Sequence, residues 1–192
     1  MSAHLGPGEG EVHDAARAVL GFWFDEVGEA RWFARDDALD RACAARFGAM
    51  RDDVLAADAL GWRSEPDHLL AAIILLDQFS RNIYRDSPRA FEADALALDL
   101  ARHCIGRGWH RTLAPSPAQF LLMPLMHAED RDVARESVQR FEELGLADAL
   151  EFARAHAAVI ERFGRYPSRN AALGRASTPE EAWFLQDNGA GW

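Results

Sequence analysis

The chain has 192 residues, enough for one domain with a substantial core, and 49% of its residues are apolar. Its formal net charge is −10, and all 21 basic residues are arginines. Such an acidic chain is poorly suited to unspecific binding of duplex nucleic acid or of an anionic membrane surface. We therefore expect neither a nucleic acid nor a membrane as a partner.

Two features of the sequence indicate a cytoplasmic protein. The cysteines, Cys43 and Cys104, have no CxxC spacing and lie in helical patterns, so we expect two buried thiols in a reducing compartment. Residues 1–11 are Gly-rich and polar, and they lack the apolar run of a signal peptide. We expect these residues to form a flexible tail and residues 12–188 to form one domain, because no linker or shift in composition divides them.

The predicted fold is all-helical. No segment alternates polar and apolar residues with period two between turn residues, so we expect no strand. The connections are short, which favours helices that pack as antiparallel neighbours. Apolar periodicity predicts helices over residues 12–26, 36–60, 69–85, 87–106, 130–144 and 147–163, with further helices that begin near residues 116 and 178.

Several helix ends carry recognisable signals. Ser64, Ser116 and Thr178 stand where an N-terminal cap is expected, the last two in capping-box patterns. The predicted helix over residues 36–60 is either continuous or broken near Gly48. Pro124 lacks a backbone donor, so we expect it to kink or end its helix.

Residues 69–85, with the sequence LLAAIILLDQFSRNIYR, form the predicted centre of the fold. The first eight are apolar on every side, which indicates a helix that is buried all round. Leu70, Ile74, Asp77 and Arg81 follow at spacings of four, three and four, so they share one stripe. Polar groups that continue a buried stripe must be paired or must face a cavity, because an unpaired buried charge is prohibitively unfavourable. The stretch therefore predicts where a site lies, although it does not name a reaction.

Polar residues of three stretches are candidates for this site: residues 77–85, 127–130 and 162–178. Asp77 and Arg81 form either a helix-stabilising ion pair or a general base with the arginine that orients it. The arginines of the third stretch lie among glycines and a proline. Their guanidinium groups suit either a bound carboxylate or phosphate, or the carboxylates of the protein itself.

The two histidines near this chemistry also allow two interpretations. His127 is either a hydrogen-bonded structural residue or an acid–base group. His156 lies on an apolar stripe, where a histidine is most often a core residue with a satisfied ring. His127, Glu129 and Asp130 resemble a ligand cluster only loosely. We find no HExxH motif and no carboxylate-x-x-His pair at helical spacing, so we expect no metal site. The chain has no P-loop and no dinucleotide fingerprint, so we expect no cofactor.

The candidate residues fall into two groups. The residues that could move a proton are Asp77, His127 and Glu129. The residues that could hold a ligand, most of them through amide or guanidinium donors, are Gln78, Arg81, Asn82, Arg85, His156, Arg165, Arg169, Asn170 and Arg175.

The motifs LLDQFSRNIYR, PLMHAED and RFGRYPSRNAALGRASTPEE, with VLGFWFDE near the start, resemble the bacterial domain-of-unknown-function family 924. They occur in the family's order and at about its separations, from Val19 to Leu185. The resemblance implies a fold similar to the stacked helix pairs of tetratricopeptide-like superhelices, and it implies little about function. Ala128, Tyr166 and Ser168 depart from the family pattern, the last standing where a histidine is common.

The favoured hypothesis is a polar, arginine-rich pocket for a small anionic molecule, used for binding or for acid–base catalysis. A buried polar stripe suits an enclosed pocket better than an open groove. The alternative is a tetratricopeptide-like module that binds an acidic peptide. A metal-dependent oxygenase and an RNA-binding protein are weaker hypotheses. The sequence decides neither whether the protein is an enzyme nor its oligomeric state.

Overall fold

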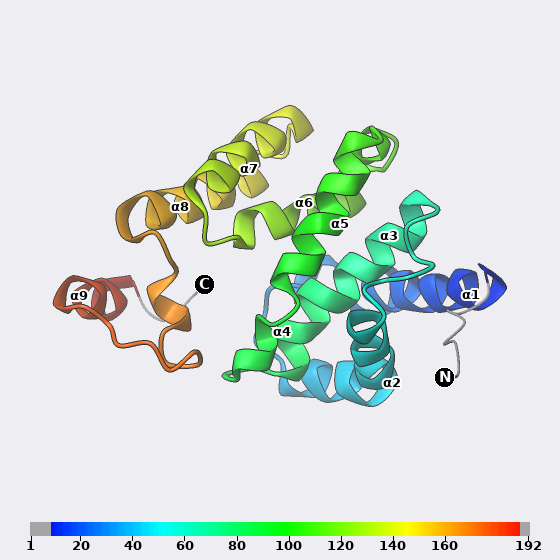
Figure 1. Cartoon of the computed structure of the whole chain (residues 1–192), viewed down its shortest axis with the longest axis horizontal. Helices are drawn as coiled ribbons and strands as arrows, with labels where there is room; N and C mark the ends of the chain where they lie inside the picture. Colours follow the sequence, from blue (N-terminus) through cyan, green and yellow to red (C-terminus); the bar gives the residue numbers. More distant parts are fainter. Residues whose placement is uncertain (1–8, 189–192) are drawn as a thin grey trace, which may run out of the picture.

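The computed structural model describes residues 9–188, which form a single all-helical domain without a strand in that range. Figure 1 shows α3, α4 and α5 in the middle, with α1 and α2 on one side and α7 and α8 on the other. The first helix begins inside the predicted tail of residues 1–11, and the rest of that tail lies outside the described residues. The α-helices are α1 (Glu9–Leu20), α2 (Asp37–Ala56), α3 (Pro66–Ile73), α4 (Ser80–Ile83), α5 (Asp94–Gly106), α6 (Pro115–His127), α7 (Arg131–Leu144), α8 (Ala147–Phe163) and α9 (Pro179–Asn188).

The central rod is one continuous helix, in which α3 leads through a π-helical turn (Ile74–Phe79) into α4. The residues from 69 to 79 are almost completely buried, as a helix with no polar face requires. The predicted central helix is therefore confirmed, although it begins at Pro66 and ends at Ile83 rather than spanning residues 69–85. A π-helical turn holds more residues than an α-helical turn and often marks a functional site. Here it contains Asp77 and Gln78.

Aromatic residues fix this rod to the N-terminal part of the chain. α1 continues as a π-helical segment (Gly21–Val27), in which Trp23 is fully buried. The Trp23 ring meets the rings of Phe79 and Phe120 edge-on, at centroid distances of 5.5 and 5.6 Å. Such edge-to-face pairs add to the burial of apolar area. No helix among the described residues combines the length and the apolar character that crossing a bilayer requires.

The predicted course of the second helix and of the helix after the rod differs from the structure. α2 runs through Gly48 without a break, because the alanine, arginine and methionine residues around it are good helix formers. The helix predicted from Ser87 begins only at Asp94. The intervening proline starts a separate 3₁₀ turn, Pro88–Ala90, in which the backbone N–H of Arg89 donates to the Ser87 side chain.

The predicted caps are confirmed at only one helix. The backbone N–H of Glu181 donates to Oγ1 of Thr178 at 3.2 Å, and the N–H of Thr178 donates to the Glu181 carboxylate at 2.7 Å, which is a complete capping box. Ser64 and Ser116 are not caps, because Glu65 occupies the N-cap position of α3 and Ala114 occupies that of α6. Pro124 lies inside α6 and does not end it.

The start of α7 allows a test of local stability. Oδ1 of Asp130 accepts hydrogen bonds from the backbone N–H groups of Asp132 and Val133, both at 2.9 Å. We expect Asp130→Ala to lower the free energy of unfolding by about 1 kcal/mol, because two donors lose their acceptor. Asp130→Asn should retain most of the cap. Urea denaturation of the three proteins measures the difference, and equal stability of wild type and Asp130→Ala would contradict it.

Candidate functional site

Asp77, on the π-helical turn, is a fully buried carboxylate at the polar end of the rod. Its Oδ1 lies 2.7 Å from Nδ1 of His127 and 3.0 Å from Nη1 of Arg81. Its Oδ2 accepts a hydrogen bond from the Gln78 amide at 2.6 Å. Because an ionised carboxylate only accepts hydrogen bonds, Nδ1 of His127 carries a proton. The first two predicted stretches therefore meet at this pair.

A second carboxylate, Asp94, connects the rod to the third stretch. Its two oxygens accept hydrogen bonds from Arg81 at 3.0 and 3.1 Å, and Oδ2 also accepts one from Nη1 of Arg169 at 2.9 Å. Asp94 was not among the predicted residues, because an aspartate in the first turn of a helix is ordinarily explained by the helix dipole alone. The one available signal was its place shortly after the polar end of the rod.

Arg169 is only 8% exposed and has contacts on several sides. Its guanidinium lies 4.7 Å from the centroid of the Phe91 ring and 4.6 Å from that of the Tyr166 ring. Its Nη2 donates a hydrogen bond to the backbone carbonyl of His127 at 2.9 Å. The Tyr166 hydroxyl donates to the carbonyl of Met126 at 2.5 Å. These contacts hold the loop after α8 against the end of α6.

Two other arginines of this loop pair with carboxylates of the chain. Arg175 forms a two-point ion pair with Glu129 at 2.6 and 2.9 Å, and Arg165 forms one with Glu181 at 2.6 and 2.8 Å. The Asn170 side chain accepts a hydrogen bond from Nε of Arg175 at 2.9 Å. Arg165 and Arg175 therefore each have a carboxylate partner within the protein.

Asn82 and Arg85 contact a different neighbour. The Asn82 amide donates to Oδ1 of Asp40 at 2.8 Å, and Arg85 donates to both oxygens of the same carboxylate at 2.9 Å. Asp40 belongs to α2. These two candidate residues therefore tie the end of the rod to α2.

Burial and charge together set the protonation of the central pair. Burial alone would raise the pKa of Asp77, but the Arg81 charge and the contact with His127 outweigh it and hold the pKa well below its usual range. For His127 burial is the larger effect, and it lowers the pKa although Asp77 opposes the shift. His127 is therefore neutral at pH 7, with Nδ1 protonated and Nε2 able to accept a proton.

His156 lies next to this pair. Its ring centroid is 6.1 Å from that of His127 and 5.7 Å from that of Tyr166. Its Nδ1 lies 2.8 Å from the carbonyl oxygen of Phe152, so this nitrogen carries the proton. Burial, reinforced by the neighbouring His127, lowers the pKa of His156 to about 3. Both histidines are therefore uncharged at neutral pH.

A partly open cavity of about 560 Å³ lies beside these groups. Its volume is in the range of small-molecule sites. Much of the wall is apolar and includes Phe91, Leu98 and Leu173. Residues of the second predicted stretch (127–130) and of the third (162–178) line the cavity directly. Asp77 and Arg81 do not line it; they contact the lining residues His127 and Asp94. The polar lining residues are Glu92, Asp94, His127, Glu129 and Arg169.

Comparison with known proteins identifies the family. The model of the family described as "Bacterial protein of unknown function (DUF924)" matches residues 19–189. The chain belongs to the DUF924 family. A solved structure of a protein of unknown function from Agrobacterium tumefaciens is similar over 92% of this chain and 99% of its own, with 31% identity and a TM-score of 0.87. No curated protein matches the chain.

The family resemblance inferred from the sequence motifs is thus confirmed, and the candidate residues of this DUF924 protein all lie within the matched range. The all-helical fold agrees with that of the Agrobacterium tumefaciens protein. That protein is itself described as one of unknown function, so the chemistry must be argued from the site.

Proposed function

We propose that this DUF924 protein binds a small molecule in the cavity beside His127, and that Nε2 of His127 removes a proton from it. The observation that carries the proposal is the 2.7 Å hydrogen bond between Nδ1 of His127 and the buried Asp77. Such a bond fixes the orientation and the tautomer of the ring, which prepares a histidine as a general base. Nε2 of His127 has no hydrogen-bond partner within residues 9–188, which leaves it available to a ligand.

The charges around the cavity favour a ligand that enters neutral and becomes anionic when it loses the proton. Three carboxylates and three guanidinium groups pair with one another there: Asp77, Asp94 and Glu129 with Arg81, Arg169 and Arg175. A permanently anionic ligand would have to displace one of these carboxylates. Negative charge that develops during proton removal needs no displacement, and the positive charge of Arg169 in the cavity wall stabilises it.

The shape and the lining of the cavity narrow the ligand further. The apolar wall formed by Phe91, Leu98 and Leu173 favours a molecule with an apolar portion opposite the group that loses the proton. A volume of about 560 Å³ suits a small molecule better than an extended peptide, which needs a longer groove.

Proton removal can be tested by isotope exchange. The protein is incubated in D₂O with a small-molecule extract of bacterial cells, and mass spectrometry identifies compounds that gain deuterium at carbon. We expect at least one such compound with wild type. His127→Gln should lower its exchange rate by a factor of at least about 100, because general-base catalysis contributes at least that factor. His103→Gln, which changes a histidine outside the cavity wall, should leave the exchange unchanged.

A binding measurement completes the test. Native mass spectrometry of the purified protein should detect a small molecule that wild type retains and that Arg169→Met retains less well. If no compound exchanges in a manner that depends on His127, and wild type retains no small molecule, the proposal is rejected.

We also propose a cytoplasmic location, which the two cysteines support. Cys43 and Cys104 are both free thiols in the core. Burial raises the pKa of each thiol to about 12, so that hardly any thiolate forms at neutral pH. Thiols of this kind are typical of structural cysteines in reducing compartments.

A further inference from the structure

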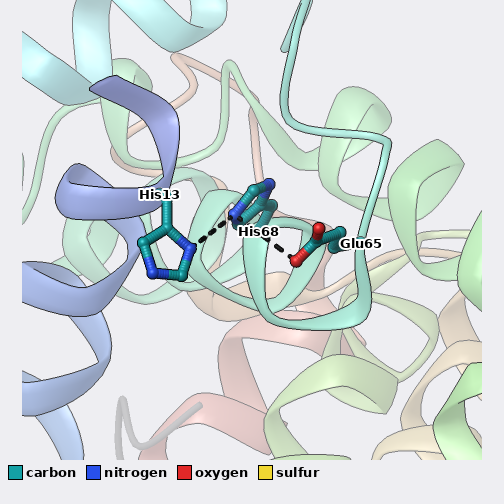
Figure 2. Close-up of side chains that lie close together, drawn as sticks. All are labelled: His13, Glu65 and His68. Carbon is teal, nitrogen blue, oxygen red and sulfur yellow. Dashed lines mark hydrogen bonds and ion pairs between the residues drawn. The ribbon is translucent and has the colours of Figure 1, made fainter. Parts of the chain in front are cut away.

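Three side chains that can ligate metals come together outside the candidate site, where α1 meets the start of α3. Figure 2 shows His13, Glu65 and His68 with their nitrogen and oxygen atoms turned toward one another. Nδ1 of His13 lies 3.5 Å from Nε2 of His68, and this Nε2 lies 3.8 Å from Oε2 of Glu65. The three ligand atoms all lie within 4.8 Å of one another.

We propose that these three side chains bind a divalent transition-metal ion, with zinc as the best fit. Zinc bonds to nitrogen and oxygen are about 2.0–2.1 Å long, so neighbouring ligand atoms of a tetrahedral site lie about 3.3 Å apart. The two shorter separations here, 3.5 and 3.8 Å, approach that value. Two imidazoles and one carboxylate are the donors of His₂Glu zinc sites, in which water takes the fourth position.

His68 is held in a suitable orientation. Its side chain is buried, and its Nδ1 lies 3.3 Å from Oγ of Ser64. When Nδ1–H donates to this hydroxyl, the lone pair of Nε2 is directed at His13 and Glu65. Histidines that bind metals usually donate their second N–H to a neighbouring acceptor in this way. Ser64, which does not cap α3, therefore has a role as the orienting partner of His68.

Arg17 opposes the metal. Its Nη2 lies 2.9 Å from Nε2 of His13, and a guanidinium group only donates hydrogen bonds. With this contact Nδ1 of His13 carries the proton, so the ring must change its tautomer before it can ligate a metal. The arginine charge also repels a cation. Arg17 is exposed and can move away, so its removal should strengthen metal binding.

The bound ion would join two segments that are distant in the sequence. His13 lies in α1 and His68 lies in the first turn of α3, 55 residues away. Because the folded chain brings the ligands together and the unfolded chain does not, the ion stabilises the folded state by mass action. The proposed ion is thus a clamp between α1 and α3.

Metal titration of the full chain tests this clamp. His4, outside the described residues, is replaced by alanine in every sample so that it cannot contribute a ligand. We expect about one zinc ion per metal-free chain by calorimetry, a higher melting temperature with zinc, and tetrahedral absorption bands when Co²⁺ replaces zinc. His13→Ala and Glu65→Gln should each weaken zinc binding by roughly tenfold or more.

Two further variants make the result specific. Arg17→Ala should strengthen zinc binding about fivefold, because it removes the competing hydrogen bond and a nearby positive charge. Glu29→Gln, which changes an exposed carboxylate elsewhere, should leave the affinity unchanged. His13, Glu65 and Arg17 are exposed, so their replacement should preserve the fold, which circular dichroism checks. The proposal is overturned if wild type binds no zinc, if both ligand variants bind it as wild type does, or if Arg17→Ala weakens binding.

Discussion

Replacement of Asp77 by asparagine should lower the free energy of unfolding at neutral pH by about 3 kcal/mol, because it leaves a buried charge without one of its partners. The Asp77 side chain is fully buried, and its carboxylate lies 3.0 Å from Arg81 and 2.7 Å from His127. An amide keeps the volume and removes the charge. Arg81 then retains Asp94 as a carboxylate partner, which keeps the loss from being larger.

This loss should shrink in acid. The pKa of Asp77 is lowered in the folded state, so its charge stabilises the fold above the unfolded pKa of about 3.9. As the pH falls below that value, Asp77 binds a proton in the unfolded chain but not yet in the folded chain. The contribution of the Asp77 charge to the free energy of unfolding is then lost. Denaturant unfolding near neutral pH and near pH 3 measures both effects.

A matched control separates the buried carboxylate from carboxylates in general. Asp86, whose side chain is 81% exposed, can also be replaced by asparagine. We expect Asp86→Asn to change stability by less than about 0.5 kcal/mol at either pH. A difference between wild type and Asp77→Asn that stays constant from neutral pH to acid would contradict the assignment.

Wild-type stability should also fall as the pH drops below about 6.5, and His156→Gln should remove much of this fall. The pKa of His156 is lowered to about 3, mainly by burial and then by the neighbouring His127. Between these values the unfolded chain binds a proton at this position and the folded chain does not. The folded state then loses up to about 1.4 kcal/mol per pH unit. The contribution is fully present above the unfolded pKa and decreases toward the folded one.

Chemical denaturation at several pH values between about 7 and about 4.5 measures this slope. The slope of His156→Gln should be smaller than that of wild type by up to about 1.4 kcal/mol per pH unit. A wild-type stability that does not change over this range would show that His156 is protonated in the folded protein.

The central rod could be predicted because its pattern allows only one solution. Eight apolar residues with no polar face require burial on all sides, and the structure buries them. The charges on the same stripe had to find partners, and Asp77 meets His127 from the second stretch. The cost of an unpaired buried charge was thus enough to anticipate that these two stretches meet.

The choice of individual partners could not be predicted. Asp94 bridges Arg81 and Arg169, and the latter is 75 residues away in the sequence. A guanidinium group accepts almost any carboxylate within reach, so neither periodicity nor spacing identifies which one it will bind. The three side chains of the proposed metal site were not predicted together for a related reason. The sequence does contain a carboxylate-x-x-His pair, Glu65 and His68, but only the fold brings His13 to it.

The π-helical turn of the rod changes the angular relation between its two ends, α3 and α4. α3 packs against α1 and α4 packs against α2, so each end of the rod has to match a different neighbour. An uninterrupted α-helix would fix the angular relation between its two ends, since each residue advances the helix by about 100°. The wider turn at Ile74–Phe79 offsets one end relative to the other. α3 can therefore fit α1 and α4 can fit α2 independently of each other. Asp77 lies in the turn that connects them.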